Sequence, residues 1–194
     1  MNLTTTTCVN ANADSELSAK GKQFAKALGD YFSTGESGVD CTQLTVFTSI
    51  LQRAKSTAAQ IPCSRYIETQ ALREMEAGVC EGLTFEEVKS KYAEEYKACQ
   101  QDILRFRYPR AENYIDVIAR LEPLIYELEQ ERGPVVVVSH QGVLRCLYAY
   151  FRELPSHEIP FLSMPLHKLI KLEMRAAGCV ESRFSLVLHD KAAA

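Results

Sequence analysis

The sequence predicts an α/β fold, a three-layer α/β/α sandwich with a largely parallel central sheet. Strand-like and helix-like segments alternate along the chain, as they do where helices connect parallel strands. Four consecutive valines, Val135 to Val138, are typical of a strand that is covered on both faces. The 194 residues are 46% hydrophobic, enough for one domain to bury a substantial core and too few for two comfortable ones. We therefore predict a single domain over residues 1–194.

The first clear strand and helix lie side by side in the sequence. Leu44 to Thr48 is a short β-prone run, and Ser49 to Ile61 follows directly with apolar residues at helical spacing. Further on, Thr84 and Glu87 have the spacing of a capping box, which predicts a helix through Tyr92. The helical pattern then resumes, so this part of the chain is expected to be mainly helical.

The longest predicted helix runs from Asn113 to Arg132. One apolar stripe follows it, Pro123 predicts a kink or two abutting helices, and Gly133 suits a C-terminal cap. The valine strand comes next, and Gly142 to Phe151 reads as the helix that follows it. Two further strands are predicted at Lys168 to Met174 and Arg183 to Leu188, the second with Phe184, Leu186 and Leu188 alternating.

Composition narrows the classes of partner. The net charge of -3 comes from 25 acidic and 22 basic residues spread along the chain, which disfavours a nucleic-acid backbone or an anionic membrane as ligand. The seven cysteines form no Cys-x-x-Cys pair and lie near no histidine at ligand spacing, which indicates reduced thiols, no metal and a cytoplasmic setting. Neither a signal peptide nor a membrane-spanning stretch is visible. A small soluble ligand is the expected partner.

Polar side chains follow two of the predicted strands, and in open α/β sheets reactive groups collect at strand ends. Arg53 lies one turn into the helix after the first strand, and its planar guanidinium suits a phosphate group. His140 follows the valine strand directly after Ser139. Such an arginine is often only a solvated surface charge, and such a histidine is often structural. The two junctions therefore indicate an anion site without settling it.

An acidic pair lies between the two junctions. Glu74 and Glu76 are two residues apart, so in an extended segment they share a face. One of them could act as a general acid if partial burial raised its pKa. Acidic residues in a loop are more often simply solvated, so the pair carries weight only together with the two strand ends.

The order and spacing of these segments resemble the histidine phosphatase superfamily, which contains the cofactor-dependent phosphoglycerate mutases. The pattern reads Thr-Ser-x-Leu-x-Arg-x-x-x-Thr-Ala, then Leu-x-Glu-x-x-x-Gly, then an aliphatic strand ending in Ser-His-Gln-x-x-x-Arg. The resemblance covers the chain from about Leu17 onward. Four segments resemble the phosphatase half of the bifunctional 6-phosphofructo-2-kinase/fructose-2,6-bisphosphatases: Ala77 to Glu81, Arg105 to Pro109, Arg120 to Pro123, and Pro165 to His167.

This resemblance implies a set of roles. Relatives move a phosphoryl group onto a histidine in an Arg-His-Gly motif after the first strand, and water later releases it. By resemblance, Arg53 clamps the phosphoryl group, and His140 holds it from the far side with help from Gln141. Glu74 protonates the departing sugar oxygen, and no cofactor is needed. Two further residues match substrate contacts of the family, Tyr114 and Arg145.

The chain departs from the family at the nucleophile. No Arg-His pair occurs in the sequence, and Leu17 to Gly21 matches a motif that comes soon after that pair, so we expect an N-terminally truncated domain. The lost strand lies in the middle of the family's sheet, and Leu3 to Val9 is a β-prone candidate to fill the gap. Three positions also depart from the tyrosine, arginine and lysine that the family uses for substrate, namely Phe85, Cys99 and Ile103.

Three functions stay open at this point. The first is a fructose-2,6-bisphosphatase-like domain that hydrolyses the 2-phosphate of fructose 2,6-bisphosphate, with activity only if the nucleophile is restored. The second is a non-catalytic sugar-phosphate-binding or regulatory domain. The third, a broad-specificity phosphatase or mutase, is disfavoured by the segments that resemble the bisphosphatases. A kinase half is not expected, because nothing matches the Gly-x-x-x-x-Gly-Lys-Ser/Thr loop that binds nucleotide phosphates.

Overall fold

A parallel three-stranded sheet forms the middle of the molecule. The structure, a computed structural model, describes residues 14–176 and 178–186. Strand β1 (Thr45–Ser49) is the central strand, with β2 (Arg65–Thr69) on one side and β3 (Val135–Val138) on the other, both parallel to it. Every residue of β1 is buried, as expected for a strand that has neighbours at both edges and helices on both faces.

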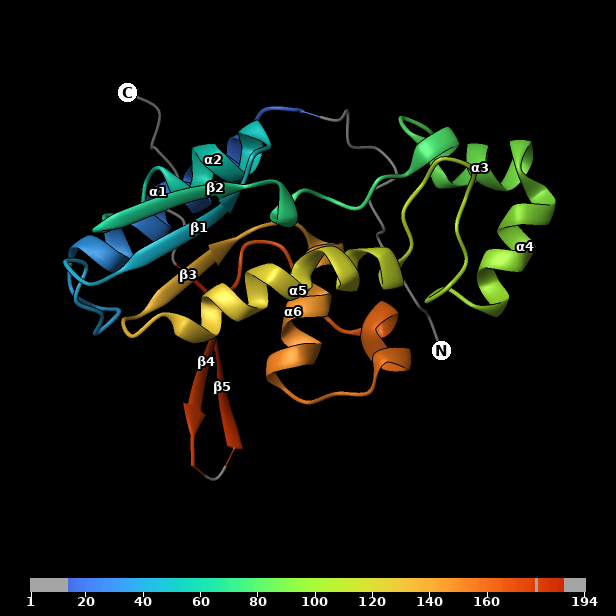
Figure 1. The fold of residues 1–194 in the computed structure, drawn as a ribbon. Coiled ribbons are helices and arrows are strands. Elements are labelled where there is room, and N and C mark those ends of the chain that lie inside the picture. Colours follow the sequence, from blue (N-terminus) through green and yellow to red (C-terminus); the bar gives the residue numbers. More distant parts are fainter. Residues whose placement is uncertain (1–13, 177, 187–194) are drawn as a thin grey trace.

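Helices cover both faces of this sheet, which confirms the predicted layered α/β architecture (Figure 1). Helices α1 (Ala19–Ser33) and α2 (Gln52–Ala58) pack on one face, and α5 (Tyr114–Gln130) and α6 (Gln141–Phe151) pack on the other. The alternation of β1 explains the division, because neighbouring strand residues point to opposite faces. Val46 joins the core with α1 and α2, and Phe47 joins the core with α5 and α6.

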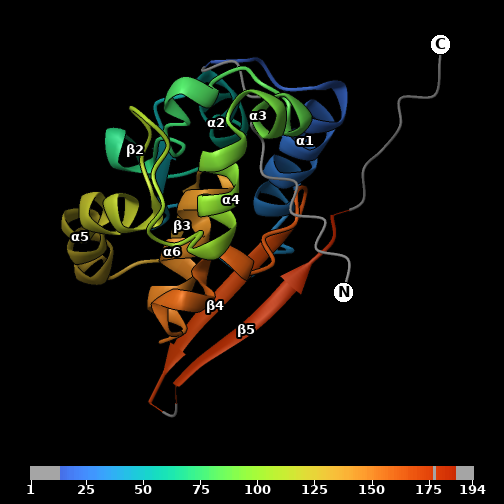
Figure 2. The ribbon, with the colours of Figure 1, turned by 90° about the vertical axis from the view of Figure 1, so that its right-hand side faces the viewer.

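The remaining elements lie around this sandwich. Helices α3 (Phe85–Lys91) and α4 (Ala93–Gln101) form a pair at one end (Figure 1), and the predicted capping box at Thr84 and Glu87 opens α3. Strands β4 (Leu169–Arg175) and β5 (Gly178–Phe184) form a separate antiparallel hairpin beside the sandwich (Figure 2), where Glu181 of β5 accepts a hydrogen bond from Tyr148 of α6. Three 3₁₀ helices complete the described chain: η1 (Gln70–Leu72), η2 (Gly78–Cys80) and η3 (Ser156–Phe161).

Within the described residues, β3 lies at an edge of the parallel sheet. Its four valines are all partly exposed, and they divide between the two cores: Val135 and Val137 pack on one side, and Val136 and Val138 on the other. The sequence interpretation of a strand covered on both faces is therefore confirmed. The run Leu3 to Val9, proposed to fill a gap in the sheet, lies outside the described residues.

Two details of the sequence prediction are wrong. The last strand was expected over Arg183 to Leu188, but β5 starts at Gly178 and ends at Phe184, because Phe184 lies opposite Leu169, the first residue of β4. Residues 187 and 188 of that prediction lie outside the described residues. Gly133 does not cap α5, which ends at Gln130 with Glu131 as its cap. Gly133 instead allows a close approach, since a Cβ there would lie 2.5 Å from the Gln43 carbonyl oxygen. Pro123 lies inside one continuous helix.

Candidate active site

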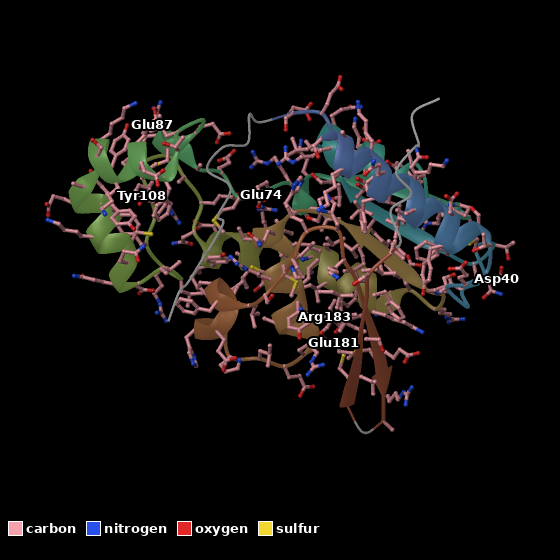
Figure 3. All side chains as sticks on the ribbon, turned by 180° about the vertical axis from the view of Figure 1, so that it is seen from behind. Asp40, Glu74, Glu87, Tyr108, Glu181 and Arg183 are labelled. Carbon is pink, nitrogen blue, oxygen red and sulfur yellow. The ribbon has the colours of Figure 1, made fainter. Side chains whose placement is uncertain are left out.

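Three segments bring polar side chains to the same edge of the parallel sheet. Arg53 lies in the first turn of α2, just after β1, and His140 is the N-cap residue of α6, just after β3. Glu74 follows β2 and the short helix η1, and lies in the middle of the molecule (Figure 3). Because the three strands are parallel, their carboxyl ends lie at one edge, and residues far apart in sequence come together there.

The His140 ring is buried and neutral. The residue is 7% exposed, and its Nε2 lies 2.8 Å from the hydroxyl oxygen of Ser49 at the end of β1. That oxygen already accepts a hydrogen bond from the Leu51 amide at 3.2 Å, so its own hydrogen is available for the ring. Burial, assisted by the positive charges of Arg53 and Arg120, lowers the pKa of His140 from its ordinary 6.5 to about 3. His140 therefore carries no charge at neutral pH.

The Glu74 carboxyl lies against the start of α6. Its Oε1 accepts a hydrogen bond from the Met75 amide at 2.9 Å, and a Cβ added to Gly142 would lie only 3.1 Å from the same oxygen. Burial raises the pKa of Glu74, while the Met75 amide and the charges of Arg53 and Arg120 act in the opposite direction. A carboxyl that is protonated more easily than usual can serve as a proton donor to a leaving oxygen.

Arg53 supplies the positive charge of the site. Its Nη1 is buried and has no hydrogen-bond partner among the described residues. Every other buried side-chain nitrogen or oxygen of the described residues has one. Burial is the larger influence on the pKa of both His140 and Glu74, and the charge of Arg53 acts to lower both values, with burial and against it respectively. A buried donor without a partner is unfavourable, and an anion that accepts from it removes that penalty. A guanidinium beside a neutral imidazole and a protonatable carboxyl is suited to an anionic phosphoryl group.

The other predicted site residues have partners within the protein. Gln141 donates from Nε2 to the Met164 carbonyl at 3.1 Å. Arg145, which is 5% exposed, donates from Nη1 to the Tyr114 hydroxyl and from Nε to the Leu162 carbonyl, both at 2.9 Å. The negative charge of Glu74 contributes to raising the pKa of Tyr114, although burial is the main cause. The Tyr114–Arg145 pair therefore lies within electrostatic reach of Glu74, and the substrate roles of these residues stay predictions.

Two neighbours of the site were not assigned a role from the sequence. Ser49 contacts the His140 ring, and Arg120 of α5 acts on the pKa values of both His140 and Glu74. Arg120 lies beside the buried face of α5, three residues after the fully buried Val117. A charged residue at the border of an apolar helical stripe was the available signal, because such a charge needs a partner inside the protein.

Three observations bear on other kinds of site, all within residues 14–176 and 178–186. No group of three or more His, Cys, Asp or Glu side chains is arranged to hold a metal ion. The six described cysteines are free, and Cys8 lies outside the described residues. None of the described helices has the length and apolar character needed to span a membrane.

Comparison with known proteins identifies the family of the chain. The profile of the Histidine phosphatase superfamily (branch 1) matches residues 2–186. The chain is 47% identical over 174 residues to the 6-phosphofructo-2-kinase/fructose-2,6-bisphosphatase of Arabidopsis thaliana, covering 90% of this chain and 23% of that protein. It is 46% identical over 165 residues to the fructose-2,6-bisphosphatase of Saccharomyces cerevisiae, covering 85% of this chain and 35% of the yeast protein. The chain thus spans about a quarter to a third of the length of these relatives.

Solved structures share the fold. The alpha-ribazole phosphatase of Shigella flexneri superposes with a TM-score of 0.71 at 23% identity, over 91% of this chain and 84% of that one. A mycobacterial glucosyl-3-phosphoglycerate phosphatase, solved with inorganic phosphate, gives a TM-score of 0.70 at 25% identity, over 88% of this chain and 86% of that one. The likeness extends over most of both chains, so it concerns the whole sandwich and not a single motif.

Proposed function

The chain belongs to the histidine phosphatase superfamily, and from this premise we propose that it is a fructose-2,6-bisphosphatase-type domain that binds the phosphoryl group of a sugar phosphate. The observation that carries the proposal is the buried Nη1 of Arg53, which has no hydrogen-bond partner in residues 14–176 and 178–186 and lies at the sheet edge where His140 and Glu74 also lie. A dianionic phosphoryl group supplies the acceptor that Arg53 lacks.

Each residue takes a role that its surroundings support. Arg53 donates to the phosphoryl oxygens, and His140 holds the group from the other side, as the family resemblance implies. In the family reaction, the bond between phosphorus and the sugar oxygen breaks while a bond forms between phosphorus and a histidine nitrogen. Glu74 gives its proton to the departing oxygen, and its raised pKa favours the protonated form that this step needs.

The nucleophile decides whether the chain turns over substrate. The sequence has four histidines and no Arg-His pair, and the family resemblance assigns His140 to holding the phosphate. Direct attack by water forms no covalent intermediate. The reaction then has to pass one difficult step in place of two easier ones, so it is slower. We therefore propose that these 194 residues bind the phosphoryl group weakly and form no phosphohistidine unless an Arg-His-Gly strand is supplied.

A non-catalytic sugar-phosphate-binding function is the second candidate, and the surroundings of Cys99 bear on the ligand that such a domain would take. Cys99 stands at a position where the family carries an arginine for the substrate, and its thiol pairs with the Tyr108 hydroxyl. The pairing lowers the pKa of Cys99, but burial is the larger effect and raises it, so the thiol stays neutral. A neutral thiol cannot replace the guanidinium that would bind a second phosphate, which favours a ligand with one phosphate.

The test uses fructose 2,6-bisphosphate labelled at the 2-phosphate. The chain is incubated with it, and released phosphate and trapped phosphoprotein are measured alongside binding by calorimetry. We expect weak binding and no acid-labile phosphohistidine, and recovery of turnover in a version extended by a strand ending in Arg-His-Gly. Arg53→Met should abolish binding, while Arg65→Met, a change at an exposed arginine on β2, should not. Rapid phosphorylation of His140 would overturn the proposal.

A further inference from the structure

One ion pair holds the backbone on both sides of Glu74. Arg120 of α5 donates from Nη1 to the Ala71 carbonyl and from Nη2 to the Arg73 carbonyl, the latter at 2.6 Å. Its Nε donates to Glu112 Oε1 at 2.8 Å. The guanidinium thus donates hydrogen bonds to two carbonyls just before Glu74, and each of its three nitrogens donates at least one hydrogen bond.

Glu112 holds the other side of the same segment. The Glu76 amide donates to Glu112 Oε2 at 3.0 Å, and the Glu112 amide donates back to the Glu76 carbonyl at 2.9 Å. The Leu72 carbonyl, in addition, accepts from the Ser139 hydroxyl at 2.8 Å, which ties the segment to the residue before His140. Residues 71–76 are therefore fixed at several backbone atoms, although only Ala71 and Leu72 belong to a regular element, η1.

We propose that Arg120 and Glu112 act as a pair of positioning residues that fix the Glu74 carboxyl beside Arg53 and His140. Neither residue needs to touch the substrate, because both act through the backbone that carries Glu74. The inference rests on the proposed role of Glu74 as the proton donor. It adds the two residues that hold this donor, and it explains how an irregular segment keeps a fixed geometry.

The chemistry of the pair supports this role over that of an ordinary ion pair. The Arg120 and Glu112 side chains are 19% and 15% exposed, so the pair is only slightly screened by solvent. The planar fork of an arginine can bind two carbonyls and a carboxylate at once, whereas a lysine is a single point charge. Arg120 also acts on the site directly, since its charge lowers the pKa of both Glu74 and His140.

The test measures Glu74 in the ligand-free chain. Carbon-13 NMR follows the titration of the Glu74 carboxyl, assigned by its loss in Glu74→Gln, and hydrogen exchange follows the Glu76 amide. The informative variants are Arg120→Lys, which keeps the positive charge and loses the planar guanidinium group, and Glu112→Gln, which keeps the shape of the side chain and loses its negative charge. The matched control is Arg107→Lys, because Arg107 is an exposed arginine that forms an ion pair with Asp116, and Asp116 lies in α5 as Arg120 does.

We expect both variants to move the pKa of Glu74 down toward its ordinary value, because a loosened segment lets water reach the carboxyl. The Glu76 amide should exchange at least about tenfold faster, which corresponds to about 1.4 kcal/mol. Arg107→Lys should change neither. If the variants melt at lower temperature while the Glu74 titration and the Glu76 exchange stay native, the pair is only structural and the inference is wrong.

If Arg120→Lys does not fold, Glu112→Gln decides the question through the Glu76 exchange, because an isosteric change at a partly exposed side chain perturbs packing least. The Glu74 titration of this variant does not count by itself, because Arg120 without its carboxylate partner also lowers the pKa of Glu74. The measurements need no ligand, so they separate this inference from the proposed function. Failure of the native chain to bind fructose 2,6-bisphosphate would count against the function and would leave the positioning result intact.

Discussion

His140 should make the folded chain sensitive to mild acid. Its pKa is about 3 in the fold, against the ordinary 6.5 expected when the chain is unfolded. Between these values the unfolded state binds a proton that the folded state does not, so the free energy of unfolding falls as the pH falls. One pKa unit corresponds to about 1.4 kcal/mol, so complete acidification through this window removes on the order of 5 kcal/mol. That amount is comparable to the whole stability of many domains.

Glu74 acts in the opposite direction, and the experiment must separate the two residues. The pKa of Glu74 is raised in the fold, so its contribution to stability is present below its ordinary value of 4.5 and is lost as the pH rises through the folded value. Comparison with His140→Asn isolates the histidine, because asparagine is neutral throughout and retains a polar group for Ser49. His157→Asn provides the control, since His157 is exposed on η3.

The assay is urea unfolding of the three proteins between pH 7.5 and 4.5. We expect the difference between the native chain and His140→Asn to change by about 1.4 kcal/mol per pH unit below pH 6, with the native chain losing more stability. His157→Asn should run parallel to the native chain. An NMR titration that places the pKa of His140 near 6.5 would refute the reasoning, because the ring would then gain no protection from burial or from Arg53.

Two further predictions concern the other residues at the strand ends. Arg53→Lys should weaken binding of inorganic phosphate by at least about tenfold in calorimetry, because a lost charge-assisted hydrogen bond is worth about 1.5–3 kcal/mol; unchanged affinity would remove Arg53 from the site. Glu74→Gln should raise the free energy of unfolding at pH 7, because the ionised carboxylate is disfavoured by burial. Thermal melting of this variant is compared with that of Glu122→Gln, a change at an exposed glutamate of α5. Equal changes in melting temperature would contradict the prediction.

The sequence predicted those elements whose signals are local. The capping box of α3, the valine strand and the stripe of α5 each depend on residues close together in sequence, and the structure contains all three. Strand β2 had no such signal, because Arg65–Thr69 is polar and largely exposed. It becomes a strand through its pairing with β1, in which Thr45 lies opposite Arg65. Helix α1 was also missed, and its burial of Leu28 and Phe32 depends on the sheet.

The same division applies to the site. Arg53 and His140 were found because each follows a strand, a position that the sequence shows directly. The role of Arg120 could not be predicted in that way. Its acceptors Ala71 and Arg73 lie 49 and 47 residues away in the sequence, and the accepting atoms are backbone carbonyls, which leave no side-chain pattern in a sequence. Contacts of this kind are set by the packing of α5 beside η1, and only the folded structure reveals them.

The three central groups of the site depend on one another for their charge states. Arg53 and Arg120 help to keep His140 neutral, and the same two cations oppose the effect of burial on Glu74. A phosphoryl dianion placed on Arg53 would offset this positive field, which would favour protonation of both His140 and Glu74. Burial is the larger cause of the low pKa of His140 and stays in place, so the ligand would raise this pKa only in part, and it would favour the protonated form of Glu74 more strongly than burial alone. If Arg53 binds the phosphoryl group as proposed, we expect binding to be accompanied by proton uptake, because the buried Nη1 of Arg53 has no hydrogen-bond partner among the described residues and its charge acts on both titratable groups.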